Sequence, residues 1–164
     1  MDWDQYFISE AYLAACKSKD PSTQVGAVIV GPDREIRAKG FNGPPRGFND
    51  DDDVVWQRPQ KYSYIVCAEA NCLYACALVG TSSKGCHMYC TFHPCSKCAA
   101  AIVQAGIVEL ITHVEFPGAS QETNWAADRI ISDRILSECR VTVRQWSGVP
   151  LIREIRANGI LHRF

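Results

Sequence analysis

Apolar positions along the chain fall into two kinds of run, and these alternate. Short, nearly continuous apolar runs are typical of buried strands, whereas longer segments rich in helix formers, or with apolar residues every three to four positions, predict helices. The predicted strands cover residues 25–30, 36–41, 86–91, 108–114 and 141–146. The predicted helices cover residues 2–17, 67–79, 95–105 and 125–139. Residues 42–60, rich in Gly, Pro and Asp, are predicted to be loop.

This alternation predicts an α/β fold in which helices cover a largely buried sheet. A chain of 164 residues suits one domain with a core of its own, and the sequence shows no internal repeat. We place the catalytic domain at residues 1–146. Residues 147–164 are a C-terminal extension to which the pattern assigns no role.

Composition narrows the class of protein. Apolar residues make up 47% and charged residues 21%, which is an ordinary globular balance, and the net charge of −1 argues against a polynucleotide partner. No apolar run approaches the length of a membrane span. The acidic start, Met1-Asp2-Trp3-Asp4, lacks the order of a signal peptide. We therefore expect a cytoplasmic protein whose nine cysteines are reduced thiols, some of them in a metal site.

Three cysteines and one carboxylate carry the strongest chemical signal. Cys67 and Glu69 stand in a Cys-Ala-Glu sequence, and Cys95 and Cys98 follow Pro94 in a Cys-x-x-Cys sequence. Three thiolates indicate a zinc ion with one open coordination position, which is what distinguishes a catalytic zinc from a structural one. A carboxylate beside the open position supplies the acid/base group that hydrolysis needs.

Spacing restricts how these residues can meet. Cys67 and Glu69 are two positions apart, so they can address one ion only if Cys67 lies at the start of a helix. Cys95 and Cys98 are three apart and share a face in the first turn of the next helix. Both helix N-termini then point at the ion, and their partial positive charge favours thiolate over thiol.

The cysteines alone are compatible with more than one kind of site. A Cys-x-x-Cys pair also occurs in redox proteins and in structural zinc modules for protein binding. A structural site would need a fourth ligand, for which Cys90 and His93 are the candidates in sequence, and it would have no use for Glu69. Cys72 and Cys76 share a helix face and could hold a second metal, although core packing is the favoured interpretation.

The zinc motif resembles that of the zinc-dependent deaminase superfamily, in which H-x-E is followed by P-C-x-x-C. More of the chain is similar to one branch, the deoxycytidylate (dCMP) deaminases. The similar stretches are residues 18–26, 40–47, 61–64, 84–89 and 104–107, and the match weakens beyond residue 111.

This resemblance implies a fold and a reaction. The fold is a three-layer α/β/α sandwich with a five-stranded mixed sheet, and the reaction is hydrolytic deamination of dCMP to dUMP and ammonia. Cys67, Cys95 and Cys98 would hold zinc, and Glu69 would move protons between water, ring nitrogen and leaving amine. The further residues that the resemblance assigns to the substrate are the backbone at Ala68 and Cys98 for the pyrimidine edge, Asn42 for the sugar, and Lys19, Ser22, Thr23 and Arg46 for the phosphate.

The resemblance also implies a homo-oligomer, commonly a hexamer, that responds to dCTP and dTTP at a subunit interface through the loop at Gly43. Residues 50–53 are four consecutive aspartates that could place magnesium with a nucleotide effector. An acidic run in a loop is more often simply solvated, and we favour that interpretation.

Two departures from the family pattern stand out. The first ligand is Cys67 where the family usually has His, which makes the zinc site one negative charge heavier. We predict a compensating cation or additional hydrogen-bond donors near the thiolates. The family's tyrosine after the fourth strand is also missing from residues 115–121, where Phe116 or Trp125 could replace the ring or simply pack. This altered segment motivates two alternative substrates, namely dCMP carrying a methyl or hydroxymethyl group at ring position 5, and dCTP alongside dCMP.

Overall fold

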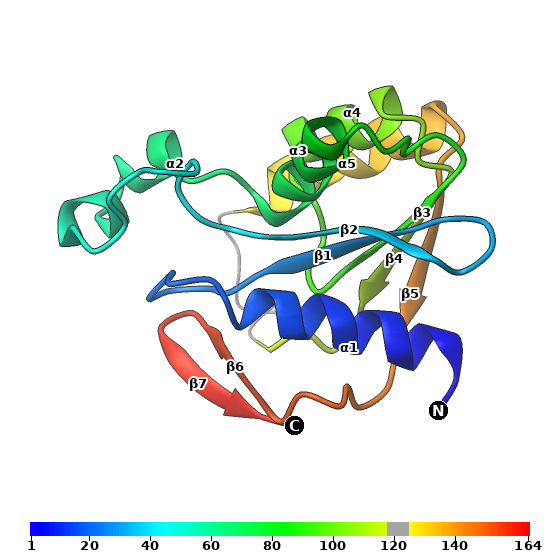
Figure 1. The fold of residues 1–164 in the computed structure, drawn as a ribbon. Helices are drawn as coiled ribbons and strands as arrows, with labels where there is room; N and C mark the ends of the chain where they lie inside the picture. Colours follow the sequence, from blue (N-terminus) through cyan, green and yellow to red (C-terminus); the bar gives the residue numbers. More distant parts are fainter. Residues whose placement is uncertain (118–124) are drawn as a thin grey trace.

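A mixed sheet of five strands forms the centre of the computed structural model, which describes residues 1–117 and 125–164 (Figure 1). The strand order is β2-β1-β3-β4-β5, with β1 antiparallel to both β2 and β3, and with β3, β4 and β5 parallel. The strands are β1 (Gly26–Val30), β2 (Ile36–Phe41), β3 (His87–Cys90), β4 (Glu109–His113) and β5 (Thr142–Trp146). Each coincides with a predicted strand to within two residues at either end.

Helices cover both faces of this sheet. Helix α1 (Trp3–Ala15) lies on one face, and α3 (Ala68–Val79), α4 (Ser96–Gln104) and α5 (Ala126–Glu138) lie on the other (Figure 1). The expected three-layer α/β/α sandwich with a five-stranded mixed sheet is therefore confirmed. No helix within the described ranges is long and apolar enough to cross a membrane.

Each face of the sheet has its own apolar core. On the α1 side, Phe7, Ile8 and Tyr12 are at most 1% exposed and pack against the sheet. On the other side, Cys72 and Cys76 of α3 are buried among apolar side chains of α4, α5 and the strands. These two cysteines are therefore core residues, as the favoured interpretation held.

Two glycines let the helices approach the sheet closely. A Cβ atom on Gly26 of β1 would lie 2.0 Å from the Ala11 carbonyl oxygen of α1. A Cβ atom on Gly40 of β2 would lie 2.4 Å from both the Ala68 carbonyl oxygen and the Cys72 nitrogen of α3. Such distances are far below van der Waals contact, so only glycine allows α1 and α3 to sit at their observed depth.

The segment between β2 and α3 extends away from the sandwich, towards the left of Figure 1. Most of it is irregular, as predicted, but it contains a short 3-10 helix, η1 (Asp53–Trp56), and one turn of helix, α2 (Lys61–Tyr64). Its return to the sandwich is fixed by two hydrogen bonds between Gly43 and Val66, the residue before Cys67.

The C-terminal extension folds back as a hairpin of two strands, β6 (Glu154–Ala157) and β7 (Ile160–Arg163). Its turn residues, Asn158 and Gly159, both have positive φ (50° and 76°), as a two-residue hairpin turn requires. Ile155 and Ala157 are at most 1% exposed and belong to the core beneath α1.

Candidate active site

The three predicted ligands converge between the first turns of α3 and α4. The sulfur atoms of Cys67, Cys95 and Cys98 all lie within 4.8 Å of one another. Cys67 has extended backbone (φ −64°, ψ 156°) and is the N-cap of α3, which confirms that it lies at a helix start. Cys95 is the N-cap of α4, so Cys98 lies one turn further on the same face.

This cluster fits a zinc ion. Three thiolates are a common protein donor set for zinc, and three ligands leave one coordination position for a water molecule or the substrate. Within the described ranges no other histidine, cysteine or acidic residue joins the cluster. Cys90 and His93, the candidates for a fourth ligand, stay outside it, so the arrangement favours an open site over a closed structural one.

Hydrogen-bond donors at the helix start stabilise negative charge on Cys95. The thiols of Cys67 and Cys98 donate to its sulfur and, with the backbone N–H groups of Lys97 and Cys98, they lower the pKa of Cys95 well below its ordinary value. The N-terminus of α4 adds its partial positive charge. When all three cysteines are thiolates, the backbone N–H groups of Lys97 and Cys98 are the donors that remain at Cys95, and they are of the kind expected to compensate for the negative charge.

Glu69 lies in the first turn of α3 and is only 4% exposed. Burial raises the pKa of its carboxyl to about 7, and the charge of Cys95 adds to this shift. The thiols of Cys98 and Cys90 form hydrogen bonds with the carboxyl and act in the opposite direction. A carboxyl of this pKa can accept and return a proton near neutral pH.

Asn42, the expected sugar contact, is held by the protein on every side of its amide. Its Nδ2 donates to Asp20 Oδ2 (3.0 Å) and to the Thr23 carbonyl (2.8 Å), while its Oδ1 accepts from the Val25 N–H (2.8 Å). The side chain therefore organises the loop before β1. Its expected contact with the sugar stays a prediction.

Asp20 is the buried centre of that loop, a role that the sequence pattern did not reveal. Its carboxylate is 2% exposed and pairs at 2.7 Å with the ammonium of Lys61, which is itself 7% exposed. It also accepts the backbone N–H groups of Ser22 (2.8 Å) and Thr23 (3.1 Å). Two residues expected at the phosphate are thus fixed through one carboxylate.

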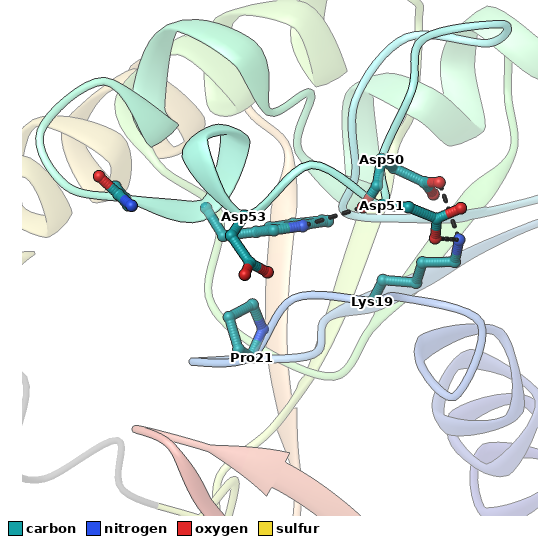
Figure 2. Close-up of a pocket in the computed structure, with 7 residues that line it drawn as sticks. Lys19, Pro21, Asp50, Asp51 and Asp53 are labelled. Carbon is teal, nitrogen blue, oxygen red and sulfur yellow. Dashed lines mark hydrogen bonds and ion pairs between the residues drawn. The ribbon is translucent and has the colours of Figure 1, made fainter.

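The other two residues expected at the phosphate are differently placed. Lys19 pairs at 2.8 Å with both Asp50 and Asp51, at the edge of a 490 Å³ pocket that Asp53 also lines (Figure 2). Two of the four consecutive aspartates at residues 50–53 are therefore paired with a lysine ammonium of the same chain. Arg46 is exposed and, among the described residues, forms no ion pair.

Phe116 and Trp125 differ as replacements for the missing tyrosine. Phe116 is 3% exposed and packs against Phe92 and Tyr12, so its role is packing. Trp125 is 38% exposed and lies edge-on to Tyr62. The rest of the altered segment, residues 118–124, lies outside the described residues.

Sequence comparison agrees with this class of zinc-dependent hydrolytic site. Residues 1–114 match the family model for the cytidine and deoxycytidylate deaminase zinc-binding region. A mouse protein named deoxycytidylate deaminase is 41% identical over 135 residues, which cover 77% of this chain and 72% of that protein. A human protein of the same name is 42% identical over 117 residues, covering 68% of this chain and 64% of that protein.

Among solved structures, dCMP deaminase from the cyanophage S-TIM5, in complex with dCMP and dUMP, is similar with a TM-score of 0.68 and 25% identity. The match covers 87% of this chain and 95% of that one. The chain therefore belongs to the cytidine and deoxycytidylate deaminase zinc-binding family. It spans about two thirds of the length of its human relative.

Proposed function

We propose that this protein converts dCMP to dUMP and ammonia by zinc-dependent hydrolysis. The observation that carries the proposal is a buried carboxyl, Glu69, in the same helix turn that begins with a ligand of an open three-thiol site. A structural zinc module has no use for such a carboxyl. The 41% identity to the mouse protein named deoxycytidylate deaminase supports dCMP as the substrate.

The roles of the chain's own residues follow from this placement. Zinc, when bound by Cys67, Cys95 and Cys98, supplies Lewis acidity that lowers the pKa of water. Glu69 accepts the proton that water releases as its oxygen bonds to ring position 4. It passes this proton to the ring nitrogen, then takes the second proton from the added hydroxyl and gives it to the amino group, so that the carbon–nitrogen bond breaks and ammonia leaves. Backbone groups at Ala68 and Cys98 hold the pyrimidine edge.

Replacing Glu69 tests the assignment directly. Glu69→Gln keeps the size of the side chain but cannot accept a proton, so we expect turnover to fall by at least about 100-fold. Zinc content per chain, measured by atomic emission, should not change because Glu69 is not a ligand. A Glu69→Gln enzyme with unaltered turnover would remove the proposed mechanism.

A kinetic panel of dCMP, 5-methyl-dCMP, 5-hydroxymethyl-dCMP and dCTP would define the substrate. The panel is motivated by the altered segment after β4, where Phe116 is committed to packing and provides no ring for a substrate. We expect dCMP to be preferred. If either position-5 derivative gave a higher kcat/KM than dCMP, that derivative would be the preferred substrate. Equal values for dCMP and dCTP would identify an enzyme that acts on both nucleotides.

We also propose a homohexamer regulated by dCTP and dTTP through the loop at Gly43, as the family resemblance implies. Exposed apolar side chains support self-association, since Leu78 of α3 and Ile130 of α5 are 69% and 70% exposed. Light scattering would give the oligomeric state. Initial rates with each triphosphate would test regulation, and rates unaffected by both would contradict it.

A further inference from the structure

The C-terminal hairpin binds directly to the loop that carries Ser22 and Thr23. The N–H of Gly159 donates to the Ser22 carbonyl at 2.7 Å, and the N–H of Asn158 donates to Thr23 Oγ1 at 3.3 Å. Both donors come from the turn between β6 and β7. The turn is therefore hydrogen-bonded to this loop, although the two segments lie more than 130 positions apart in the chain.

Strand β6 continues the attachment one residue further. The Gln24 N–H donates to the Arg156 carbonyl at 2.9 Å, and the Arg156 N–H donates to Gln24 Oε1 at 3.1 Å. The hairpin is itself anchored in the core by Ile155 and Ala157. The loop is therefore hydrogen-bonded to a hairpin that shares its apolar core with α1.

The attachment determines the hydrogen-bonding direction of the Thr23 hydroxyl, and Arg58 determines that of the Ser22 hydroxyl. Thr23 Oγ1 accepts from the Asn158 N–H, and Ser22 Oγ accepts from Arg58 Nη2 at 3.2 Å. Within residues 1–117 and 125–164, neither hydroxyl donates to another group. Because neither hydroxyl hydrogen has an acceptor among the described residues, each hydroxyl can donate to a bound ligand, and phosphate oxygens are acceptors of this kind.

Arg58 adds positive charge at the same place. Its side chain is exposed, and it forms no ion pair with a described carboxylate, in contrast to Lys19 and Lys61. The guanidinium stacks on the Tyr62 ring at 5.7 Å while it donates to Ser22. A dianionic phosphate beside Ser22 would thus meet two hydroxyl donors and one uncompensated cation.

We propose that the β6–β7 hairpin is part of the substrate site: its Asn158–Gly159 turn holds Ser22 and Thr23 where their hydroxyl groups donate to the substrate phosphate. This inference rests on the proposed function, and it gives the C-terminal extension the role of a positioning element. It concerns recognition of the phosphate only. The zinc ligands and Glu69 lie on other elements, so proton transfer should not depend on the hairpin.

The test compares ligands with and without phosphate. Deleting residues 158–164 removes the turn and β7 but leaves the buried Ile155 and Ala157. We expect kcat/KM for dCMP to fall about tenfold, the loss expected when two hydrogen bonds are broken, while kcat/KM for deoxycytidine stays within about twofold. Phe164→Ala in the full chain is the matched control, because it removes the ring that packs on Tyr12 and keeps the turn.

Gly159→Val in the full chain is the second variant, in case the deletion fails to fold. A β-branched residue at φ 76° is strained, so the turn must distort, although its Cβ would meet no atom closer than 4.0 Å. A fall in kcat/KM for dCMP but not for deoxycytidine, in either variant, supports the proposal. Parallel losses on both substrates, or no loss, would overturn it.

Binding of products separates this proposal from the proposed function. Calorimetry gives the ratio of the dissociation constants of deoxyuridine and dUMP without any turnover. We expect that ratio to fall about tenfold in the deletion variant. If the unaltered protein deaminates neither substrate, the proposed function fails, and the binding ratio still decides whether the hairpin supports a phosphate site. An unaltered protein that binds both products equally would overturn the inference.

Discussion

The buried ion pair between Asp20 and Lys61 allows a sharp prediction about stability. Replacing Lys61 with Met keeps an unbranched side chain, one heavy atom shorter, and removes its charge. The Asp20 carboxylate, 2% exposed, would then be left without a cation but would keep three hydrogen-bond donors, two from the backbone and one from Asn42. An uncompensated buried charge destabilises a fold strongly, and the remaining donors lessen this effect.

The expected size of the loss follows from that balance. Removing one partner of a buried ion pair lowers the free energy of unfolding by about 3–5 kcal/mol. Because three hydrogen-bond donors to Asp20 remain, we expect a loss of about 3 kcal/mol for Lys61→Met. Domains of this size are typically stable by about 5–15 kcal/mol, so the variant should fold but with much less reserve. With a urea dependence of about 2 kcal/mol per molar, the midpoint should fall by about 1.5 M.

Urea unfolding at pH 7, followed by circular dichroism, measures this shift. Lys39→Met is the matched control, because Lys39 pairs with Glu10 at the surface and its side chain is 43% exposed. Such a pair contributes at most about 1 kcal/mol. Adding Asp20→Asn to Lys61→Met should recover part of the loss. A Lys61→Met midpoint no lower than that of Lys39→Met would refute the reasoning.

Three further predictions concern other parts of the molecule. Cys67→His restores the family's usual ligand, so this variant should retain one zinc ion per chain, as measured by atomic emission. Cys67→Ala should lose most of its zinc. Equal zinc content in the two variants would contradict the ligand assignment. The hydrogen bond from Arg144, with its charge, lowers the pKa of Asp4, so this carboxyl stabilises the fold above its unfolded pKa of about 4, and the contribution is lost as the pH falls through the folded pKa. Asp4→Asn should therefore lower the melting temperature at pH 7 and make it less sensitive to acid, and an unchanged pH profile would show that the pair contributes nothing. Thiol labelling of the zinc-loaded protein should modify Cys16 and Cys139 first, since these two cysteines are exposed, and mass spectrometry would identify a different pair if the burial were wrong.

The elements that the sequence predicted well are those with strong local signals. Apolar runs located the inner strands β1, β3 and β4, because buried strands have few polar positions to interrupt the run. The edge strands β2 and β5 have a weaker pattern, since they carry Arg37, Lys39 and Arg144. The start of α3 at Cys67 was predicted from geometry, since a thiol and a carboxylate two positions apart can face one ion only at a helix end. The zinc site was accessible from sequence because its ligands lie in two short local motifs.

The parts that sequence reasoning missed depend on contacts between distant segments. Asp20 and Lys61 lie 41 positions apart, and neither has a local pattern that distinguishes it from an ordinary surface charge. The hairpin had a usable signal in Asn158-Gly159, a pair that favours two-residue turns. What the sequence did not contain is the surface on which that hairpin rests, since Ile155 looks like any other apolar residue until α1 covers it.

Gly40 has a consequence for how this protein can tolerate mutation. The site is assembled from two helices that are separate in sequence, with Cys67 and Glu69 on α3 and Cys95 and Cys98 on α4. The depth of α3 on the sheet is set by a residue that has no side chain, since a single methyl group on Gly40 would collide with the backbone of Ala68 and Cys72. A mutational scan should therefore find Gly40 among its most restricted positions, although this residue contacts neither metal nor substrate. Its lack of a side chain fixes the distance between the two halves of the site.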